Sequence, residues 1–152
     1  MTTFVSSADA ELLTAYRATT WTIKTPSAAR RIRLGSGALS DPLLLPSGII
    51  TAYNPSSVAL RPAENEALHR RLFNELSRPG VTMYPTLASG ATDPGGEWDE
   101  PGFAVTGLDR AGLVQVASDY GQNAIVWLGG SGTARLIVTR QGFCGRAQGE
   151  FL

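Results

Sequence analysis

The sequence predicts a single α+β domain in which helices pack on a mixed, mostly antiparallel sheet with a split βαβ core. Two observations predict this class. Between residues 48 and 128 the hydrophobic patterns follow the order strand, helix, strand, strand, helix, strand. The chain has 152 residues, of which 43% are hydrophobic and 17% charged, enough for one buried core and too apolar for disorder. We expect the domain to span residues 1–140, with 141–152 as a flexible, Gly-rich tail.

The N-terminal part is expected to add one helix and two strands to this core. Asp9 is a good helix-capping residue, and the apolar residues after it are three or four positions apart, which predicts a helix over 10–17. Residues 19–24 are rich in β-branched and aromatic types and predict a strand. Residues 31–34 alternate charged and apolar side chains, which predicts an exposed second strand.

The first half of the core is a buried strand, a helix and a further strand. The strand over 48–53 ends at Asn54-Pro55-Ser56-Ser57, a strong turn signal. Pro62 stands where the first helical position should be, and the predicted helix runs to about Ser77 before Pro79-Gly80. Residues 81–84 then predict a strand.

A long loop over 86–102 separates the two halves of the core, and loops of this length in a compact domain are usually functional or disordered. A strand over 103–108 follows it, and Asp109 and Gly121 bound the next helix. A hairpin over 123–139 is expected to complete the sheet. The order of the core elements is the one found in ferredoxin-like folds.

Composition also narrows the classes of partner and the compartment. The formal net charge is zero, which makes nucleic-acid binding unlikely because phosphate contacts need a cationic surface. The only basic cluster is Arg30, Arg31 and Arg33, on a strand expected to face solvent. The chain has a single cysteine, Cys144, and residues 1–10 lack the features of a secretion signal, so we expect a cytoplasmic protein. No apolar run approaches the ~20 residues of a membrane helix.

The central helix is expected to carry two polar side chains on its buried face. Four apolar residues define that face: Leu68, Leu72, Phe73 and Leu76. Asn65 and His69 fall within the same arc. An inward asparagine without a partner costs about 1–3 kcal/mol, so we expect Asn65 to bond the preceding turn at Asn54-Pro55-Ser56. Asn65 then either braces that turn or helps it to orient a ligand, whereas His69 is expected to be a satisfied core histidine.

Further polar residues fall at the ends of predicted elements. Thr51, Tyr53, Asn54 and Ser56 close one strand, where ligands often bind. The helix that begins near Pro62 would add backbone donors suited to an anion. Gln122 and Asn123 precede another strand, and Gln122 would lie near Asn54 if the two strands are antiparallel neighbours. Turn and element-end chemistry accounts for all of these residues equally well.

The long loop contains three carboxylates and a tryptophan: Glu97, Trp98, Asp99 and Glu100. Such a group could act as an acid–base pair, clamp a cationic ligand or hold a divalent cation. The spacing matches no known metal loop, so we expect neither a metal site nor a cofactor. Trp98 packed on the core, with the acids solvated, is the simpler interpretation. His69 and Cys144 are each the only residue of their type, and nothing predicts a Cys–His nucleophile pair.

Several segments, taken together, resemble a known family. They include residues 16–21, Ile50-Thr51-Ala52-Tyr53-Asn54-Pro55-Ser56, Glu64-Asn65-Glu66, residues 96–100 with Phe103, and residues 122–126, in this order. The combination is similar to a bacterial family catalogued as domain of unknown function 3293. The resemblance implies a small bacterial domain without an established activity. Arg61 stands where the family pattern has a helix-capping Ser or Thr, so we expect Ser57 or water to cap that helix.

The sequence leaves three functions open. The first is a domain that binds a small polar ligand or a peptide segment in a cleft at the strand ends. The second is an enzyme that uses the carboxyl group of Glu97 or Glu100 for acid–base chemistry, and the third is a protein-interaction or regulatory module. The candidate ligand-binding residues are Thr51, Tyr53, Asn54, Ser56, Asn65, Glu97, Trp98, Glu100, Gln122 and Asn123. This candidate site exists only if these side chains converge.

Overall fold

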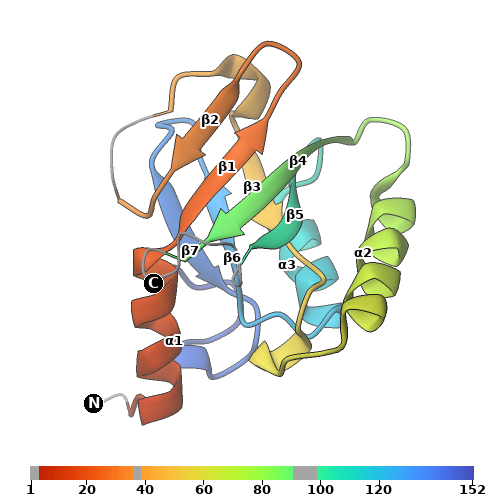
Figure 1. Cartoon of the computed structure of the whole chain (residues 1–152). Coiled ribbons are helices and arrows are strands. Elements are labelled where there is room, and N and C mark those ends of the chain that lie inside the picture. Colours follow the sequence, from red (N-terminus) through yellow and green to blue (C-terminus); the bar gives the residue numbers. More distant parts are fainter. Residues whose placement is uncertain (1–3, 36–38, 91–98) are drawn as a thin grey trace.

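The structure is a computed structural model that describes residues 4–35, 39–90 and 99–152. Within these residues it has an α+β fold, as predicted, with three helices on one sheet (Figure 1). The helices are Ser7–Ala18 (α1), Pro62–Leu76 (α2) and Arg110–Asp119 (α3). The strands are Thr20–Lys24 (β1), Ala29–Ile32 (β2), Ser47–Ile50 (β3), Thr82–Ser89 (β4), Glu100–Thr106 (β5), Ala124–Leu128 (β6) and Ala134–Val138 (β7). None of the helices in these ranges is long and apolar enough to cross a membrane.

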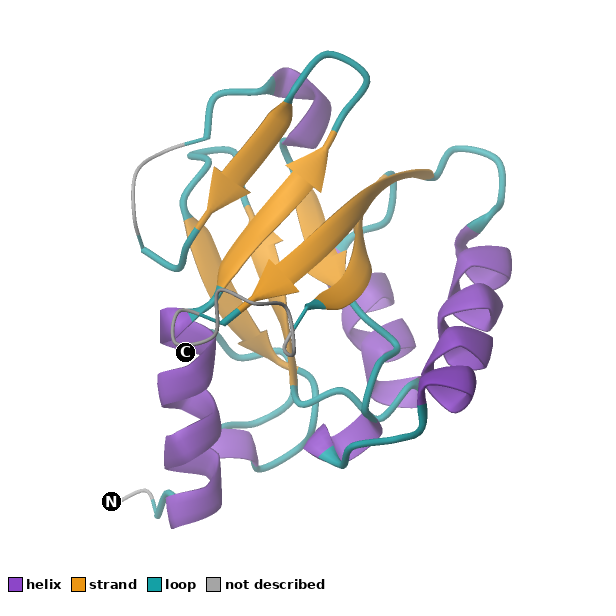
Figure 2. Ribbon diagram, viewed as in Figure 1, coloured by secondary structure: helices purple, strands orange, loops and turns teal. Residues whose placement is uncertain are grey.

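The sheet has the strand order β2-β1-β4-β5-β3-β6-β7, and every pair of neighbours is antiparallel. The mixed sheet of the sequence prediction is therefore corrected to an antiparallel one. The sheet is curled, so that its two ends approach each other (Figure 2). The main-chain N–H of Gly35, just beyond β2, donates to the carbonyl of Ala134 in β7 at 3.0 Å.

The two faces of the sheet carry two hydrophobic clusters, because successive strand residues point to opposite sides. In β3, Ile49 packs in one cluster and Ile50 in the other. The cluster around Ile50 is covered by α2 and α3, and that around Ile49 by α1 and the C-terminal segment. The three helices accordingly lie on different sides of the sheet, with α1 apart from α2 and α3 (Figure 1).

The long loop of the sequence prediction is shorter in the structure, because β4 continues to Ser89 and β5 begins at Glu100. Two prolines lie inside these strands although proline has no N–H for a sheet ladder. Pro85 of β4 lies one residue past the last pair with β1, Ile23↔Thr86. Pro101 of β5 lies beyond the last pair with β3, Ile50↔Phe103. Each proline thus occupies a position where the pairing with the neighbouring strand has ended on one side.

Residues 141–152, for which we expected a flexible tail, lie packed against β7. Phe143 is fully buried and Cys144 is buried beside it, both in the cluster under α1. Beyond them the chain runs along β7, where the N–H of Val138 donates to the carbonyl of Glu150 at 2.8 Å. Phe151 forms an antiparallel bridge with Ile137. This C-terminal segment is part of the domain, since it completes the core.

The helix caps differ from the sequence prediction. Ser6, not Asp9, caps α1, and its hydroxyl accepts a hydrogen bond from the main-chain N–H of Asp9 at 3.1 Å. Arg61 occupies the cap position of α2, but its side chain pairs with Glu64 and makes no capping bond, while the Ser57 hydroxyl bonds Asn123 instead. The buried face of α2 is made by Leu72 and Leu76 with Asn65, whereas Phe73, expected in this face, is 47% exposed.

Candidate functional site

The end of β3 is the meeting point of the predicted site residues. Because β3 runs antiparallel to β5 and β6, its C-terminal end lies beside the N-terminal ends of both neighbours. The segment 51–57 therefore lies near Glu100, the first residue of β5. It also lies near Gln122 and Asn123, which lead into β6. The strands over 48–53 and 123–128 are antiparallel neighbours, the condition under which Gln122 was expected to lie near Asn54.

Asn65 and Asn54 form a mutual pair between α2 and the turn. The Asn65 Nδ2 donates to Asn54 Oδ1 at 2.7 Å, and Asn65 Oδ1 accepts from the Asn54 main-chain N–H at 2.8 Å. Asn54 Oδ1 also accepts from the N–H of Leu60 at 3.0 Å. The buried asparagine on the inner face of α2 thus has its partner in the turn, as its helical position predicted.

The backbone of this turn adopts an unfavourable conformation that its neighbours stabilise. Asn54, Ser56 and Ser57 have φ angles of 47°, 57° and 58°, in the left-handed region that residues other than glycine rarely adopt. The N–H of Ser56 donates to the carbonyl of Gly121 at 2.7 Å. Gln122 Nε2 donates to the carbonyl of Tyr53 at 3.1 Å. Such conformations persist where surrounding contacts impose them.

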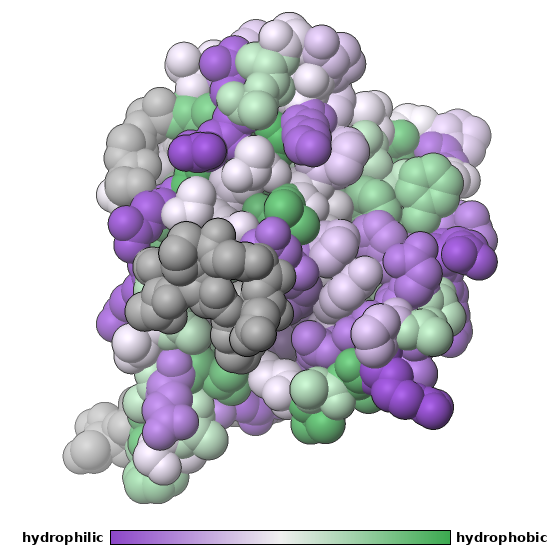
Figure 3. Space-filling view, in the orientation of Figure 1, coloured by the Kyte–Doolittle hydropathy of each residue, from purple (hydrophilic) through white to green (hydrophobic). Residues whose placement is uncertain are grey.

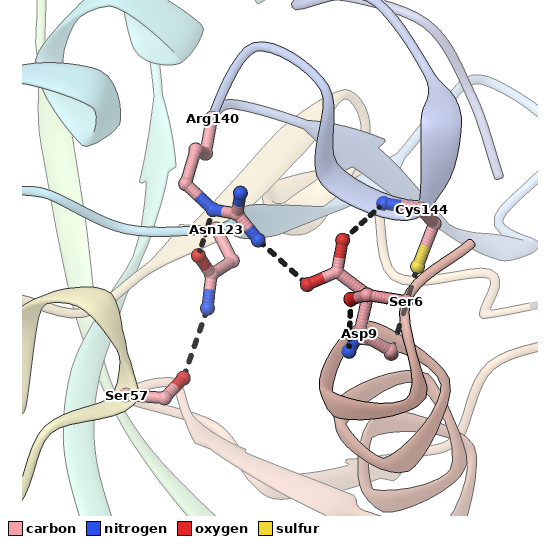
Figure 4. Close-up of polar contacts among 6 residues, drawn as sticks. All are labelled: Ser6, Asp9, Ser57, Asn123, Arg140 and Cys144. Atoms are coloured by element: carbon pink, nitrogen blue, oxygen red, sulfur yellow. Dashed lines mark hydrogen bonds and ion pairs between the residues drawn. The ribbon is translucent and has the colours of Figure 1, made fainter. Parts of the chain in front are cut away.

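Asn123 joins the turn to the other side of the molecule. Its Nδ2 donates to Ser57 Oγ at 2.9 Å, and its Oδ1 accepts from Arg140 Nε at 2.8 Å. Arg140 also forms an ion pair with Asp9 of α1, with 2.8 Å between Nη2 and Oδ1 (Figure 4). The other oxygen of Asp9 accepts from the N–H of Cys144 at 2.9 Å. The side chains of Asn123 and Gln122 therefore both hydrogen-bond to the segment 53–57 and hold it in place.

Thr51 connects the end of β3 to β5. Its hydroxyl donates to the carbonyl of Pro101 at 2.8 Å and accepts from the N–H of Tyr53 at 3.0 Å. These hydrogen bonds link the chain to β5 just beyond the last backbone pair between β3 and β5. Thr51 therefore has a structural role, which is to fix the chain that leads into the turn.

A cleft of about 640 Å³ opens between the turn, the first residues of α2 and the start of β5. Of the residues that the structure describes, nine line it: Tyr53, Asn54, Ala59, Leu60, Pro62, Ala63, Asn65, Glu66 and Asp99. Hydrophilic side chains gather over α2 on the face shown in Figure 3. The cleft has polar groups on two sides and a small apolar wall from Leu60, Pro62 and the two alanines.

Three groups, Glu100, Tyr53 and Tyr16, have raised pKa values. Burial raises the pKa of the Glu100 carboxyl to about 7, and its interaction with the Thr51 hydroxyl acts against this shift. Burial also raises the pKa of the Tyr53 phenol, and the charges of Glu66 and Glu100 and a hydrogen bond with Glu66 add to the effect. Tyr16 of α1 has a raised pKa for the same first reason, burial, with a further contribution from Glu100. The charge of Glu100 thus acts on both phenols.

His69 packs beside the cleft in a row of aromatic rings. Its ring stacks on Phe103 with centroids 4.6 Å apart and meets the Tyr53 ring edge-on at 5.7 Å. Burial lowers the pKa of His69, against the opposing charge of Glu66. Its buried Nδ1 has no hydrogen-bond partner among the described residues, so the expectation of a satisfied core histidine is wrong in this respect. The role of the ring is to support Tyr53 by packing.

The predicted site residues divide into three groups. Tyr53, Asn54 and Asn65 line the cleft, whereas Thr51, Ser56, Gln122 and Asn123 hold the turn in place. Glu100 lies next to the cleft-lining Asp99 and is not itself part of the lining. Glu97 and Trp98 lie outside the described residues.

The cleft also has lining residues that the predicted set omits. Asp99 belongs to the acidic loop segment, but only Glu97, Trp98 and Glu100 were chosen from it. Glu66 lies one residue after Asn65, so a search for acids around the buried asparagine would have found it. Among the described residues, no three His, Cys, Asp or Glu side chains are placed to hold a metal ion.

The fold and the cleft define a small α+β domain with a candidate ligand site at one end of an antiparallel sheet. The chain belongs to the family described as "Protein of unknown function (DUF3293)", whose family model matches residues 50–125, half of the chain. The match runs from the end of β3 to the start of β6, so it contains every lining residue of the cleft. No curated protein and no solved structure matches the chain.

Proposed function

We propose that this domain binds a small polar ligand in the cleft between the 53–57 turn and the start of α2. The observation that carries the proposal is the turn itself, where three residues other than glycine have positive φ angles next to a cleft. A backbone of this kind costs of order 1–3 kcal/mol per residue and is concentrated at binding and catalytic sites. Hydrogen bonds between the turn and Asn65, Gly121 and Gln122 hold it in this conformation.

The dimensions and chemistry of the cleft support the same function. Its volume of about 640 Å³ falls in the range of about 300–1,000 Å³ that is usual for small-molecule sites. The Tyr53 side chain offers a hydroxyl and a ring face, and Glu66 and Asp99 offer carboxylate acceptors. A preformed site of this kind binds its ligand with little ordering of the protein.

Ligand binding can be tested by NMR on the ¹⁵N-labelled full chain with mixtures of small polar metabolites. We expect a binding compound to shift the amide signals of Tyr53, Asn54 and Asn65 together. Ala59→Trp should fill the cleft and abolish these shifts, whereas Ala10→Trp, at an exposed position of α1, should leave them unchanged. Shifts that survive Ala59→Trp, or a diverse library without any response at the three amides, would contradict the proposal.

A second candidate function is acid–base catalysis by Glu100. A carboxyl group with a pKa of about 7 can both accept and donate a proton at neutral pH, which an ordinary glutamate does poorly. In this case Glu100→Gln abolishes turnover of a substrate found in a panel of hydrolase and transferase reactions, with and without divalent metal. Turnover that is unaffected by Glu100→Gln would exclude this residue as the acid or base.

We also infer that the centre of the sheet is the split βαβ core expected from the sequence. The strand order β4-β5-β3-β6 supports this, with α2 connecting β3 to β4 and α3 connecting β5 to β6. Both helices pack in the cluster around Ile50, on one side of the sheet. In this arrangement the cleft lies beside the first of the two crossover helices.

A further inference from the structure

The charged residues that line the cleft are of one sign. Glu66 and Asp99 both contribute carboxylates, and none of the lining residues that the structure describes is Lys, Arg or His. Glu100 follows Asp99 in the chain, and its ionisation would add a third negative charge near the cleft. A ligand with a positive charge would therefore meet a favourable potential, and an anion would be repelled.

The two lining carboxylates retain capacity for a ligand. Asp99 Oδ1 accepts from the hydroxyl of Ser89 at 2.8 Å, a neutral contact that orients the carboxylate without compensating its charge. Glu66 lies 3.7 Å from Arg70, four residues on along the same exposed helix face, and such pairs are worth about 0.3–0.5 kcal/mol. Glu66 also shares a hydrogen bond with the Tyr53 phenol, and each carboxylate has lone pairs beyond these contacts that can accept from a cation.

The start of α2 is a poor anion site, in spite of its position in the cleft. Pro62 has no N–H, and the N–H groups of Glu64 and Asn65 both donate to the carbonyl of Arg61, at 3.0 and 3.1 Å. The first turn therefore offers only the N–H of Ala63 to a ligand. The sequence suggested that the start of this helix could bind an anion. In the structure an anion there would meet one N–H donor and two carboxylates that repel it.

The Tyr53 side chain adds a surface that suits an organic cation. Its ring is held edge-on against His69, which is itself stacked on Phe103. The faces of aromatic rings attract ammonium and guanidinium groups, by about 0.5–2 kcal/mol depending on exposure. A ring beside two carboxylates suits an organic ammonium group, because its charge meets the carboxylates and its carbon chain can pack on the ring.

We propose that the ligand of the cleft is an organic cation, a compound that places an amine or guanidinium group between Glu66, Asp99 and the Tyr53 ring. This proposal rests on the proposed ligand-binding function and specifies its ligand class. The anionic and neutral ligand classes are its alternatives.

Three four-carbon probes of different charge test the ligand class: putrescine, 1,4-butanediol and succinate. We expect putrescine to shift the amide signals of Tyr53, Asn54 and Asn65 in an NMR titration, and its affinity to fall as sodium chloride is raised. The diol and succinate should bind at least about tenfold more weakly, which corresponds to about one charge-assisted hydrogen bond.

Isosteric variants test whether the carboxylates of the cleft are responsible for putrescine binding. Asp99→Asn and Glu66→Gln should each weaken putrescine about tenfold or more, whereas Glu11→Gln, an equal loss of charge on the exposed face of α1, should leave its affinity unchanged. Equal weakening by all three variants would reduce the effect to net charge and overturn the proposal.

The outcomes also separate this proposal from the proposed function. Succinate or the diol binding as tightly as putrescine at these amides would refute the cation and leave the ligand cleft standing. If none of the three probes shifts these amide signals, the proposed cation class is overturned. If the metabolite library also fails to shift them, the proposed ligand-binding function is overturned as well.

Discussion

The side chain of Asn65 holds Asn54 at two points, through a 2.7 Å bond to its amide oxygen and a 2.8 Å bond from its main-chain N–H. The same oxygen of Asn54 receives the N–H of Leu60, so a single pair of residues joins the turn, the following loop and α2. The conformation of the turn, with Asn54 in the left-handed region, depends on this pair.

The first prediction concerns Asn65. Asn65→Ala removes the acceptor of the Asn54 N–H and one donor to the Asn54 amide, and leaves these groups in a partly buried position. We expect a loss of about 1–3 kcal/mol in the free energy of unfolding, measured by urea denaturation. Asn74→Ala, at an exposed position of the same helix, is the control and should change stability by less than about 0.5 kcal/mol. Equal stability of the two variants would contradict the importance of the pair.

A second prediction concerns the backbone at Ser56, where φ is 57°. Ser56→Gly relieves the steric cost of this conformation, and the gain is offset by the larger entropy of glycine in the unfolded chain, so stability should change little. Ser56→Val places a β-branched side chain there and should cost about 1–2 kcal/mol. Thermal unfolding of the two variants measures the difference. A valine variant as stable as the glycine variant would show that the turn relaxes to another conformation.

The third prediction concerns Asp9, which binds both Arg140 and the main chain at Cys144. Asp9→Ala should lower stability by about 1–2 kcal/mol, since the ion pair is only partly shielded from solvent. It should also speed the reaction of the Cys144 thiol with a disulfide reagent, because burial and the Asp9 charge raise the pKa of this thiol in the native protein. Glu11→Ala, on the exposed face of α1, should change neither quantity. An unchanged thiol rate in Asp9→Ala would mean that the C-terminal segment is held without Asp9.

The fourth prediction is a pH dependence that originates at Glu100. Burial raises the pKa of this carboxyl from 4.5 to about 7 in the folded protein, so the native state binds the proton more tightly than the unfolded chain. The stability that this group contributes is therefore complete below about pH 4.5 and is lost as the pH rises to about 7.

The measurement is a comparison of chemical denaturation for the wild type and Glu100→Gln at pH 5 and pH 8. The glutamine variant should lose less stability than the wild type between these two pH values. Glu11→Gln, at an exposed site, should follow the wild type. Parallel curves for the wild type and Glu100→Gln would show that Glu100 titrates normally.

Much of the fold and part of the site could be predicted from local sequence patterns. The position of Asn65 on the inner face of α2 follows from helical periodicity, and its nearest available partner was the preceding turn. The pairing of β3 with β6 was left open by the sequence, as the condition for placing Gln122 near Asn54. The inference about Asn65 succeeded because it depended on a regular repeat and on neighbours close in the chain.

The errors come from contacts between residues distant in sequence. The predicted loop over 86–102 was too long, because β4 continues to Ser89 and β5 begins at Glu100, and the sequence alone does not tell which strands lie beside these segments. The Gly-rich composition of residues 141–152 indicated mobility, although Phe143 is fully buried under α1. Asp9 was assigned to a helix cap, whereas its partners Arg140 and Cys144 lie more than a hundred residues away.

The segment that runs along β7 determines how the sheet can meet other molecules. Its hydrogen bonds to Leu136 and Val138 occupy main-chain groups that an edge strand would otherwise offer to a second polypeptide. Exposed edges of this kind allow sheets to join and aggregate. At the opposite end of the order, β2 is only four residues long and carries Arg30 and Arg31, two charges that discourage such joining. Removal of the last residues would therefore expose β7 as an edge strand with which another polypeptide could pair.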